Sequence, residues 1–180
     1  MKRIHNNLLI AAAVAAGALT VTSCSEKTDF TGEWVKGTPA NVTDAFQPSK
    51  LATSTTKIMF ERNPSSTDGN VTLTADYDIT PAASDTTAQT VVKGTATVTG
   101  TWSFDVDDEN DLLLSYDMST VSVSMADSSA SAYKDQVSQA FMRELTQYSV
   151  LEDVEVSKDG KTMTVELQSP ERKVVFRKTN

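Results

Sequence analysis

The stretch NVTLTADYDI, residues 70–79, alternates polar and apolar side chains along its whole length. Its apolar members all fall on odd positions: Val71, Leu73, Ala75, Tyr77 and Ile79. Successive side chains of a β-strand point to opposite faces of a sheet. The period of two therefore predicts a strand with one face in a core and the other in solvent.

The same alternation continues through most of the chain. Apolar residues next fall on even positions between residues 92 and 118 and then on odd positions from 121 to 125, which predicts a β-bulge near Ser119 and Thr120. Eight strands are expected in all: Gly32–Gly37, Thr55–Arg62, Asn70–Thr80, Ala88–Val106, Asp111–Met125, Val150–Ser157, Lys161–Gln168 and Arg172–Lys178.

The connections between these strands are short, so neighbours in sequence are expected to pair antiparallel. Residues 35–50 contain Pro39 and Pro48 and are expected to form a loop. The predicted fold class is mainly β, an eight-stranded antiparallel up-and-down barrel, which leaves no exposed strand edge. A two-sheet sandwich is the alternative.

One segment follows a different period. Residues 129–148 carry an apolar stripe at spacings of three and four, formed by Tyr133, Val137, Ala140, Phe141, Leu145 and Tyr148. This pattern predicts one α-helix between strands 5 and 6, packed on the barrel through that stripe. The helix is expected to be either a lid across the mouth or, as we favour, a buttress along the side. A helix on a membrane surface is disfavoured because only Lys134 and Arg143 are basic.

The N-terminus is expected to be a lipoprotein signal peptide. Lys2 and Arg3 precede an apolar run, residues 8–19, that is too short to span a bilayer as a helix. The following Val21-Thr22-Ser23-Cys24 resembles a bacterial lipobox. The chain then divides into a cleaved signal peptide (1–23), a lipidated tether (24–31) and a barrel domain (32–180). An ordinary secretory signal is the alternative.

The lipobox resemblance implies a membrane partner. In such lipoproteins the cysteine receives a diacylglycerol and its freed amine is acylated, with palmitate as a typical chain, so Cys24 would carry the anchor. More than one acyl chain gives stable anchoring. Ser25 is not the Asp of inner-membrane retention signals, so the expected place is the outer membrane, on its periplasmic or cell-surface face.

Gly32-Glu33-Trp34 in the first strand and Arg177 in the last resemble the G-x-W motif and the terminal Arg of lipocalins. The chain is similar to small lipocalin-like (calycin-like) lipoproteins of Bacteroidetes-type bacteria. The resemblance implies that Gly32, Trp34 and Arg177 close the barrel, with the guanidinium over the indole, as a structural feature and not a ligand site. The helix departs from the family, in which it usually follows the eighth strand.

Composition excludes several kinds of chemistry. The net charge of −8 disfavours nucleic-acid partners, and the single histidine and cysteine are His5 and Cys24. With His5 cleaved and Cys24 acylated, Ser-His triads, thiol nucleophiles, His/Cys zinc sites and axial-His haem are excluded. No cofactor, metal or enzymatic activity is expected. The acidic run Asp105, Asp107, Asp108, Glu109 and Asp111 fits a hairpin turn better than a calcium loop.

The barrel interior is the expected place for a ligand. Candidate lining residues are the inward aromatic and sulfur-bearing ones: Phe60, Tyr77, Trp102, Phe104, Tyr116 and Met118. Small inward residues at Ala75, Gly94, Ala96 and Gly100 would leave room. Two functions remain open: binding a small apolar or amphipathic ligand, or serving as a filled structural or protein-interaction module of the envelope whose partner is unknown. An apolar cavity open at one end would favour the first.

Overall fold

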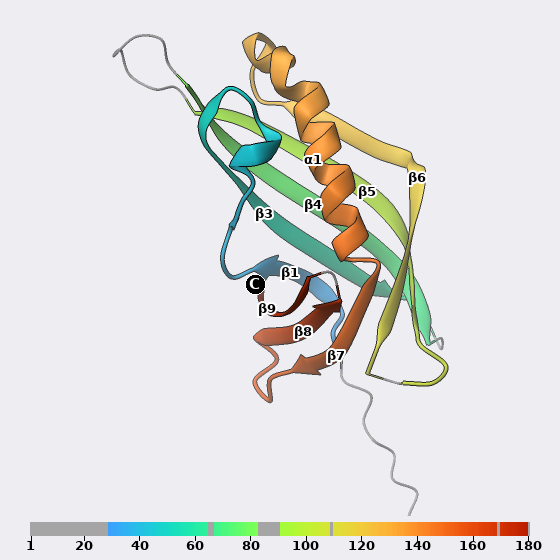
Figure 1. Ribbon diagram of the computed structural model, residues 1–180. Helices are drawn as coiled ribbons and strands as arrows, with labels where there is room; N and C mark the ends of the chain where they lie inside the picture. Colours follow the sequence, from blue (N-terminus) through green and yellow to red (C-terminus); the bar gives the residue numbers. More distant parts are fainter. Residues whose placement is uncertain (1–28, 65–66, 83–90, 109, 169, 180) are drawn as a thin grey trace, which may run out of the picture.

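The computed structural model describes residues 29–64, 67–82, 91–108, 110–168 and 170–179 (Figure 1). The strands are β1 (Gly32–Lys36), β2 (Ala40–Asn41), β3 (Ser49–Arg62), β4 (Asp68–Pro81), β5 (Val92–Phe104), β6 (Leu112–Met125), β7 (Val150–Val156), β8 (Thr162–Gln168) and β9 (Glu171–Lys178). Helix α1 (Lys134–Gln147) follows a 3-10 turn, Ser128–Tyr133, and a second one spans Thr43–Ala45. The predicted signal peptide and Cys24 lie outside the described residues.

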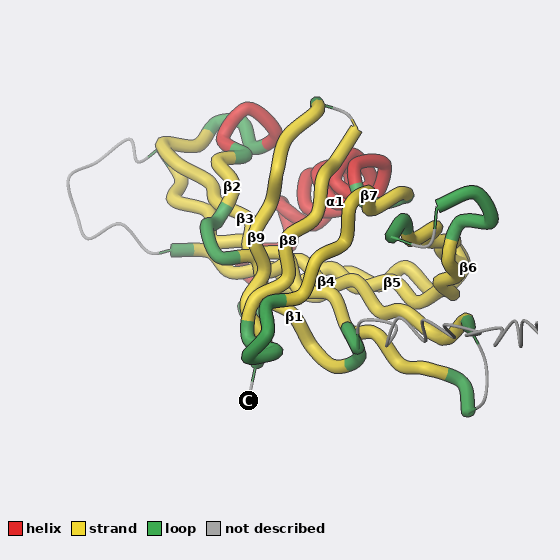
Figure 2. The backbone as a smooth tube through the Cα atoms, turned by 90° about the horizontal axis from the view of Figure 1, so that it is seen from below, coloured by secondary structure: helices red, strands yellow, loops and turns green. Residues whose placement is uncertain are grey.

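The strands form a closed antiparallel barrel, as Figures 1 and 2 show. Their order in the sheet is β1-β9-β8-β7-β6-β5-β4-β3-β2, and β1 also pairs with β3, which closes a ring of eight strands with β2 attached to β3. From β2 to β9, strands adjacent in sequence are neighbours in the sheet, whereas β1 pairs with β3 and β9 and not with β2. The predicted antiparallel barrel is confirmed, and the sandwich alternative is wrong.

The position predicted for the helix needs a correction. The helix follows strand 6 and precedes strand 7, and does not lie between strands 5 and 6. The difference arises because the segment expected to be a loop contains β2, which pairs with β3 through Ala40↔Ser54 and Asn41↔Thr53. Strand β3 also begins at Ser49 and not Thr55. Its inward positions there include the buried Ser54 and Thr56, so no apolar alternation marked it.

Helix α1 packs within the curve of the sheet. Strands β3 to β6 have 13 or 14 residues, whereas β7 to β9 have 7 or 8, so the long strands project beyond the short ones. Figure 1 shows α1 lying across the concave side of the projecting part. Its stripe residues Val137, Phe141 and Leu145 are buried, which confirms the predicted packing on the barrel.

Gly94 lets the helix approach the barrel wall. A Cβ built at Gly94 would lie 3.1 Å from Cγ2 of Val137 and 3.1 Å from Sδ of Met125. These separations are tighter than nearly all real Cβ contacts. At Gly94, the space left by a small inward residue is therefore occupied by the helix.

The predicted bulge in β6 is confirmed. Thr97 of β5 pairs with Ser122, and Thr99 pairs with Asp117, so two steps along β5 correspond to five along β6. The extra residues include Ser119 and Thr120. They shift the phase of the alternation, and the apolar positions of β6 change there from even to odd.

Candidate ligand-binding cleft

The six predicted ligand-lining residues do not share a cavity. Phe60 and Trp102 are fully buried at one end of the barrel and pack edge-to-face on Phe30, with ring centroids 5.2 and 4.8 Å away. Phe104 joins the same cluster, 5.8 Å from Phe30. This end of the barrel is therefore filled by side chains. Phe30 was expected in the tether, but its 1% exposure places it in the core.

The other three candidates lie elsewhere. Tyr77 is buried and its hydroxyl donates to Oε2 of Glu144 at 3.1 Å. The hydroxyl of Tyr116 donates to the carbonyl oxygen of Tyr148 at 2.9 Å. Met118 lies within the β6 bulge and is 47% exposed. These residues position the helix or face solvent, and none lines the cleft described below.

The cation over Trp34 is Lys178 and not the predicted Arg177. Nζ of Lys178 lies 5.3 Å from the ring centre of Trp34, and Arg177 is exposed. The reason is register: Trp34 pairs with Lys178, whereas Val35 pairs with Arg177, so the two basic side chains lie on opposite faces of the sheet. Trp34 itself is fully buried, and its indole N–H donates to the carbonyl oxygen of Phe30 at 2.6 Å.

Glu144 of α1 inserts a carboxylate between the helix and the barrel wall. Its Oε2 accepts from Oγ of Ser54 at 2.9 Å and from Tyr77, and its Oε1 accepts from Oγ1 of Thr56. The residue is 8% exposed. A buried carboxylate is tolerated when donors surround it, and here three hydroxyls from β3 and β4 do so. Sequence analysis missed this site because Glu144 lies beside the apolar stripe.

A cleft opens where the barrel wall is interrupted between β2 and β9. Its inner part, about 200 Å³, lies between β1, the Thr43–Ala45 turn and α1. Its outer part, about 720 Å³, runs along β9 beside residues 36–41. Lys36, Ala40 and Arg172 line both parts, so the two are continuous. The sequence did not predict this cleft, because it predicted a loop where β2 lies and did not say where on the barrel the end of α1 packs.

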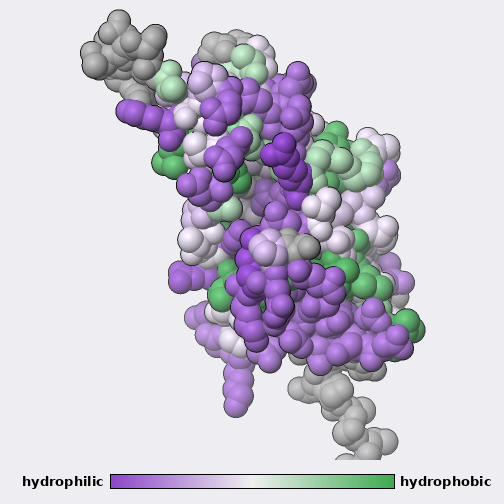
Figure 3. Space-filling view, in the orientation of Figure 1, coloured by the Kyte–Doolittle hydropathy of each residue, from purple (hydrophilic) through white to green (hydrophobic). Residues whose placement is uncertain are grey.

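Basic side chains predominate in the lining of this cleft. Lys36, Arg143 and Arg172 line the inner part, and Lys173 and Arg177 line the outer part. The rest of the inner lining consists of the apolar Ala40, Val42, Ala45 and Ala140 and of the polar Asp44, Glu144 and Gln147. Figure 3 shows hydrophilic residues covering much of this side of the molecule, over α1 and the β7–β9 end. A cluster of cations is notable in a chain of net charge −8.

Lys36 is the most constrained cation of the cleft. Burial lowers the pKa of its ammonium, the nearby Glu144 carboxylate partly opposes that shift, and Arg172 adds to it. No ion pair or hydrogen bond holds its ammonium within the part of the chain that the structure describes. Arg172 is held in place, since its Nη2 donates to Oε1 of Gln147 at 2.5 Å. An anion entering the cleft would meet an oriented guanidinium and a half-buried ammonium.

The acidic run between β5 and β6 forms a turn. The carboxylates of Asp105 and Asp108 accept backbone N–H bonds from Asp107 at 2.8 Å and from Asn110 at 2.9 Å. Oδ1 of Asp111 accepts from the backbone N–H of Asp153 at 3.0 Å. Among the described residues, no group of three or more His, Cys, Asp or Glu side chains is arranged to hold a metal ion. Glu109 lies outside the described residues.

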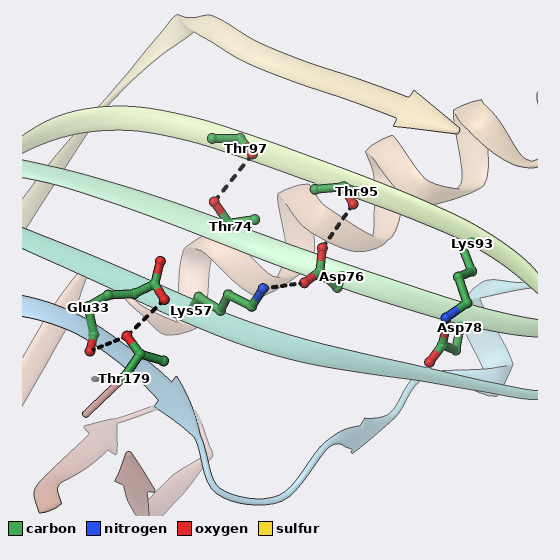
Figure 4. A network of polar contacts seen from close by, with 9 residues as sticks. All are labelled: Glu33, Lys57, Thr74, Asp76, Asp78, Lys93, Thr95, Thr97 and Thr179. Carbon is green, nitrogen blue, oxygen red and sulfur yellow. Dashed lines mark hydrogen bonds and ion pairs between the residues drawn. The ribbon is translucent and has the colours of Figure 1, made fainter. Parts of the chain in front are cut away.

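The outer face of the barrel carries polar side chains that form ion pairs and hydrogen bonds with one another. Lys57 pairs with Asp76 at 2.7 Å, Thr95 donates to Asp76 at 2.8 Å, and Lys93 pairs with Asp78 at 3.6 Å (Figure 4). These groups are partly or largely exposed, and such pairs contribute little stability. Asp76 and Asp78 therefore lie on the face of the 70–79 strand that the alternation predicts to be in solvent.

Comparison with known proteins gives no family. No protein-family model matches the chain, and no curated protein matches it. Within the described part of the chain, no helix has both the length and the apolar character needed to cross a membrane.

Proposed function

We propose that this protein is a lipid-anchored envelope protein of the outer membrane that binds a small amphipathic anion in the cleft between β1–β2, β9 and α1. Cys24 carries the anchor, and the role is binding and not catalysis. The observation that carries the proposal is Lys36, a half-buried ammonium that forms no ion pair in the described chain, at the point where both parts of the cleft meet.

The lining supports a ligand with two chemical ends. An acidic head group bound by Lys36 and Arg172 would receive charge-assisted hydrogen bonds, which are roughly twice as strong as neutral ones. An apolar tail would lie on Ala40, Val42, Ala45 and Ala140. This location replaces the barrel interior, which is filled by the aromatic cluster and by α1. The proposal also keeps the resemblance to lipocalins, but only for the barrel and not for the place of the ligand.

Calorimetric titration with octanoate and with 1-octanol tests the proposal. The two probes have the same chain length and differ in charge. We expect octanoate to bind more tightly than octanol, and Lys36→Met to weaken octanoate binding about 10- to 100-fold, the range that corresponds to a charged hydrogen bond. Lys158→Met, in the exposed β7–β8 turn, is the matched control and should bind like the wild type. Equal binding of octanoate by all three proteins would contradict the proposed site.

A further inference from the structure

Strand β6 has a long edge without a sheet partner. On the side of β7 it pairs only through Leu112↔Leu151 and Leu113↔Val150, and the N–H of Leu114 donates to the carbonyl oxygen of Ser149 at 2.8 Å. From Ser115 to Met125 its pairing in the described sheet is with β5 alone. Figure 1 shows no described segment alongside β6 on its outer side. The ring is closed through Leu112 and Leu113, and the part of β6 that projects beyond β7 keeps one edge unpaired.

The register identifies the backbone groups on this edge. Because the N–H of Leu114 points toward β7, that of Tyr116, which precedes the bulge, points to the same side. After the bulge the phase changes: the N–H of Ala126 donates to Lys93 of β5, which leaves Val121, Val123 and Met125 directed outward. A row of free N–H and C=O groups is a template for another strand.

The side chains of β6 do not protect this edge. Natural edge strands are commonly guarded by Lys, Pro or inward-pointing charges. Residues 112–125, LLLSYDMSTVSVSM, contain no Pro and no basic residue, and Asp117 is their single charge. The bulge between Asp117 and Ser122 is the one protective feature of the strand itself. Hydrophobic residues are visible on the β6 side of the surface in Figure 3.

We propose that β6 pairs antiparallel with β6 of a second copy of this chain, which makes the protein a homodimer. Two identical strands that pair antiparallel are related by a two-fold axis. The same edge is used on both chains, so the assembly stops at two copies. With the axis at Val123, Val121 lies opposite the partner's Met125 and Ser122 lies opposite the partner's Ser124.

Charge explains why a second copy fits this edge. Around Val123 the strand is neutral, so pairing two copies brings no like charges into contact at this edge, although each chain has a net charge of −8. The regular part of the strand, Val121 to Met125, carries no carboxylate, so none is brought opposite another there. A basic or an acidic peptide would find no complementary charge along residues 119–125. This inference does not depend on the cleft or its ligand.

Two lysine pairs test the interface. Ser122 and Ser124 are exposed, so Ser122→Lys/Ser124→Lys alters the edge without entering the core. In the dimer each new lysine lies directly opposite a lysine of the partner, which destabilises cross-strand pairs. Thr101→Lys/Ser103→Lys is the matched control, because it places the same charges at the same spacing on the exposed face of the interior strand β5.

The measurement is the protein mass of the acylated protein in detergent, from light scattering with the detergent contribution subtracted, over a range of concentrations. We expect two chains for the wild type and the control, and a dissociation constant raised at least about tenfold in the Ser122/Ser124 variant. Amide hydrogen exchange at Val121, Val123 and Met125 should be faster in that variant, while thermal unfolding shows that it still folds. A single-chain mass for the wild type, or equal dissociation of both lysine variants, would overturn the proposal.

Discussion

At the residue scale, two single side chains decide how the barrel is held together. Trp34 is buried under Lys178 and hydrogen-bonded to Phe30, so it fixes the start of β1 to the aromatic cluster at the filled end. Glu144 anchors the other end, where its carboxylate accepts hydrogen bonds from hydroxyls of β3 and β4 and so connects α1 to these strands.

Trp34→Ala is expected to lower the free energy of unfolding by about 3–5 kcal/mol, because it removes a large core side chain and leaves a cavity. Denaturant unfolding measures this change. Lys178→Gln keeps the indole buried and removes only the cation, so its loss should not exceed about 2 kcal/mol. An unchanged melting temperature in Trp34→Ala would show that this residue does not close the barrel.

Glu144→Ala is expected to cost about 2–4 kcal/mol, because the hydroxyls of Ser54, Thr56 and Tyr77 lose a common acceptor inside the protein. Urea unfolding monitored by circular dichroism would detect it. The control is Glu155→Ala on β7, an exposed position where the change should stay within about 0.5 kcal/mol. If both variants unfolded at the same urea concentration, the carboxylate would not anchor the helix.

At the element scale, the position of α1 is the feature that most changes the interpretation of the sequence. Period-two alternation was sufficient to predict the long strands β4, β5 and β6, and the phase change at Ser119 located the bulge. The start of β3 was missed because its inward residues are small or polar, and β2 has only two residues.

The site was beyond the reach of the sequence for a related reason. The apolar stripe predicts that α1 packs on the barrel, but periodicity cannot say whether the helix lies inside or outside a curved sheet. The inward aromatic residues therefore looked available to a ligand, whereas Phe30 and α1 already cover them. Lys36 and Arg172, which are far apart in sequence, meet only because β1 and β9 close the ring.

Helix α1 is expected to behave as a fixed part of the core and not as a lid. Amides from Val137 to Leu145 should exchange with the same free energy as those of β4, since burial of the stripe prevents separate opening. Native-state hydrogen exchange at low denaturant makes the comparison. Exchange of α1 at a clearly lower free energy than β4 would mean that the helix opens by itself, as a lid does.

At the scale of the whole molecule, buried tyrosines predict how stability depends on pH. Burial raises the pKa of Tyr148 to about 12, against the opposing effect of its hydrogen bond with Thr56, and burial also raises the pKa of Tyr77 and Tyr116. The folded chain keeps these protons when the unfolded chain loses them near pH 10. Stability is therefore complete below about pH 10 and falls as the pH rises toward 12.

Denaturant unfolding between pH 8 and 12 tests this dependence. We expect a loss of up to about 1.4 kcal/mol per pH unit for each tyrosine that stays protonated only in the fold. Tyr148→Phe should make the decline shallower, because it removes one of the three titrating groups. A stability that did not change from pH 9 to 12 would be incompatible with these buried hydroxyls.

Anchoring also belongs to the whole molecule. Cys24→Ser is expected to release the protein from membranes, because it removes the acylation site that the Val21-Thr22-Ser23-Cys24 motif predicts. Membrane fractionation with a carbonate wash measures this, and Ser25→Ala is the neighbouring control that should stay bound. Retention of the Cys24→Ser protein in the washed membranes would place the anchor elsewhere.

Ligand binding in the cleft is the central claim, and native mass spectrometry of the protein purified from its own host tests it most directly. We expect a small amphipathic acid to accompany the wild-type protein and the Lys158→Met variant and to be absent from the Lys36→Met variant. The reason is that, of these two lysines, Lys36 lines the cleft and Lys158 does not. The same bound species in all three proteins, or none in the wild type, would contradict the assignment of this cleft as a binding site.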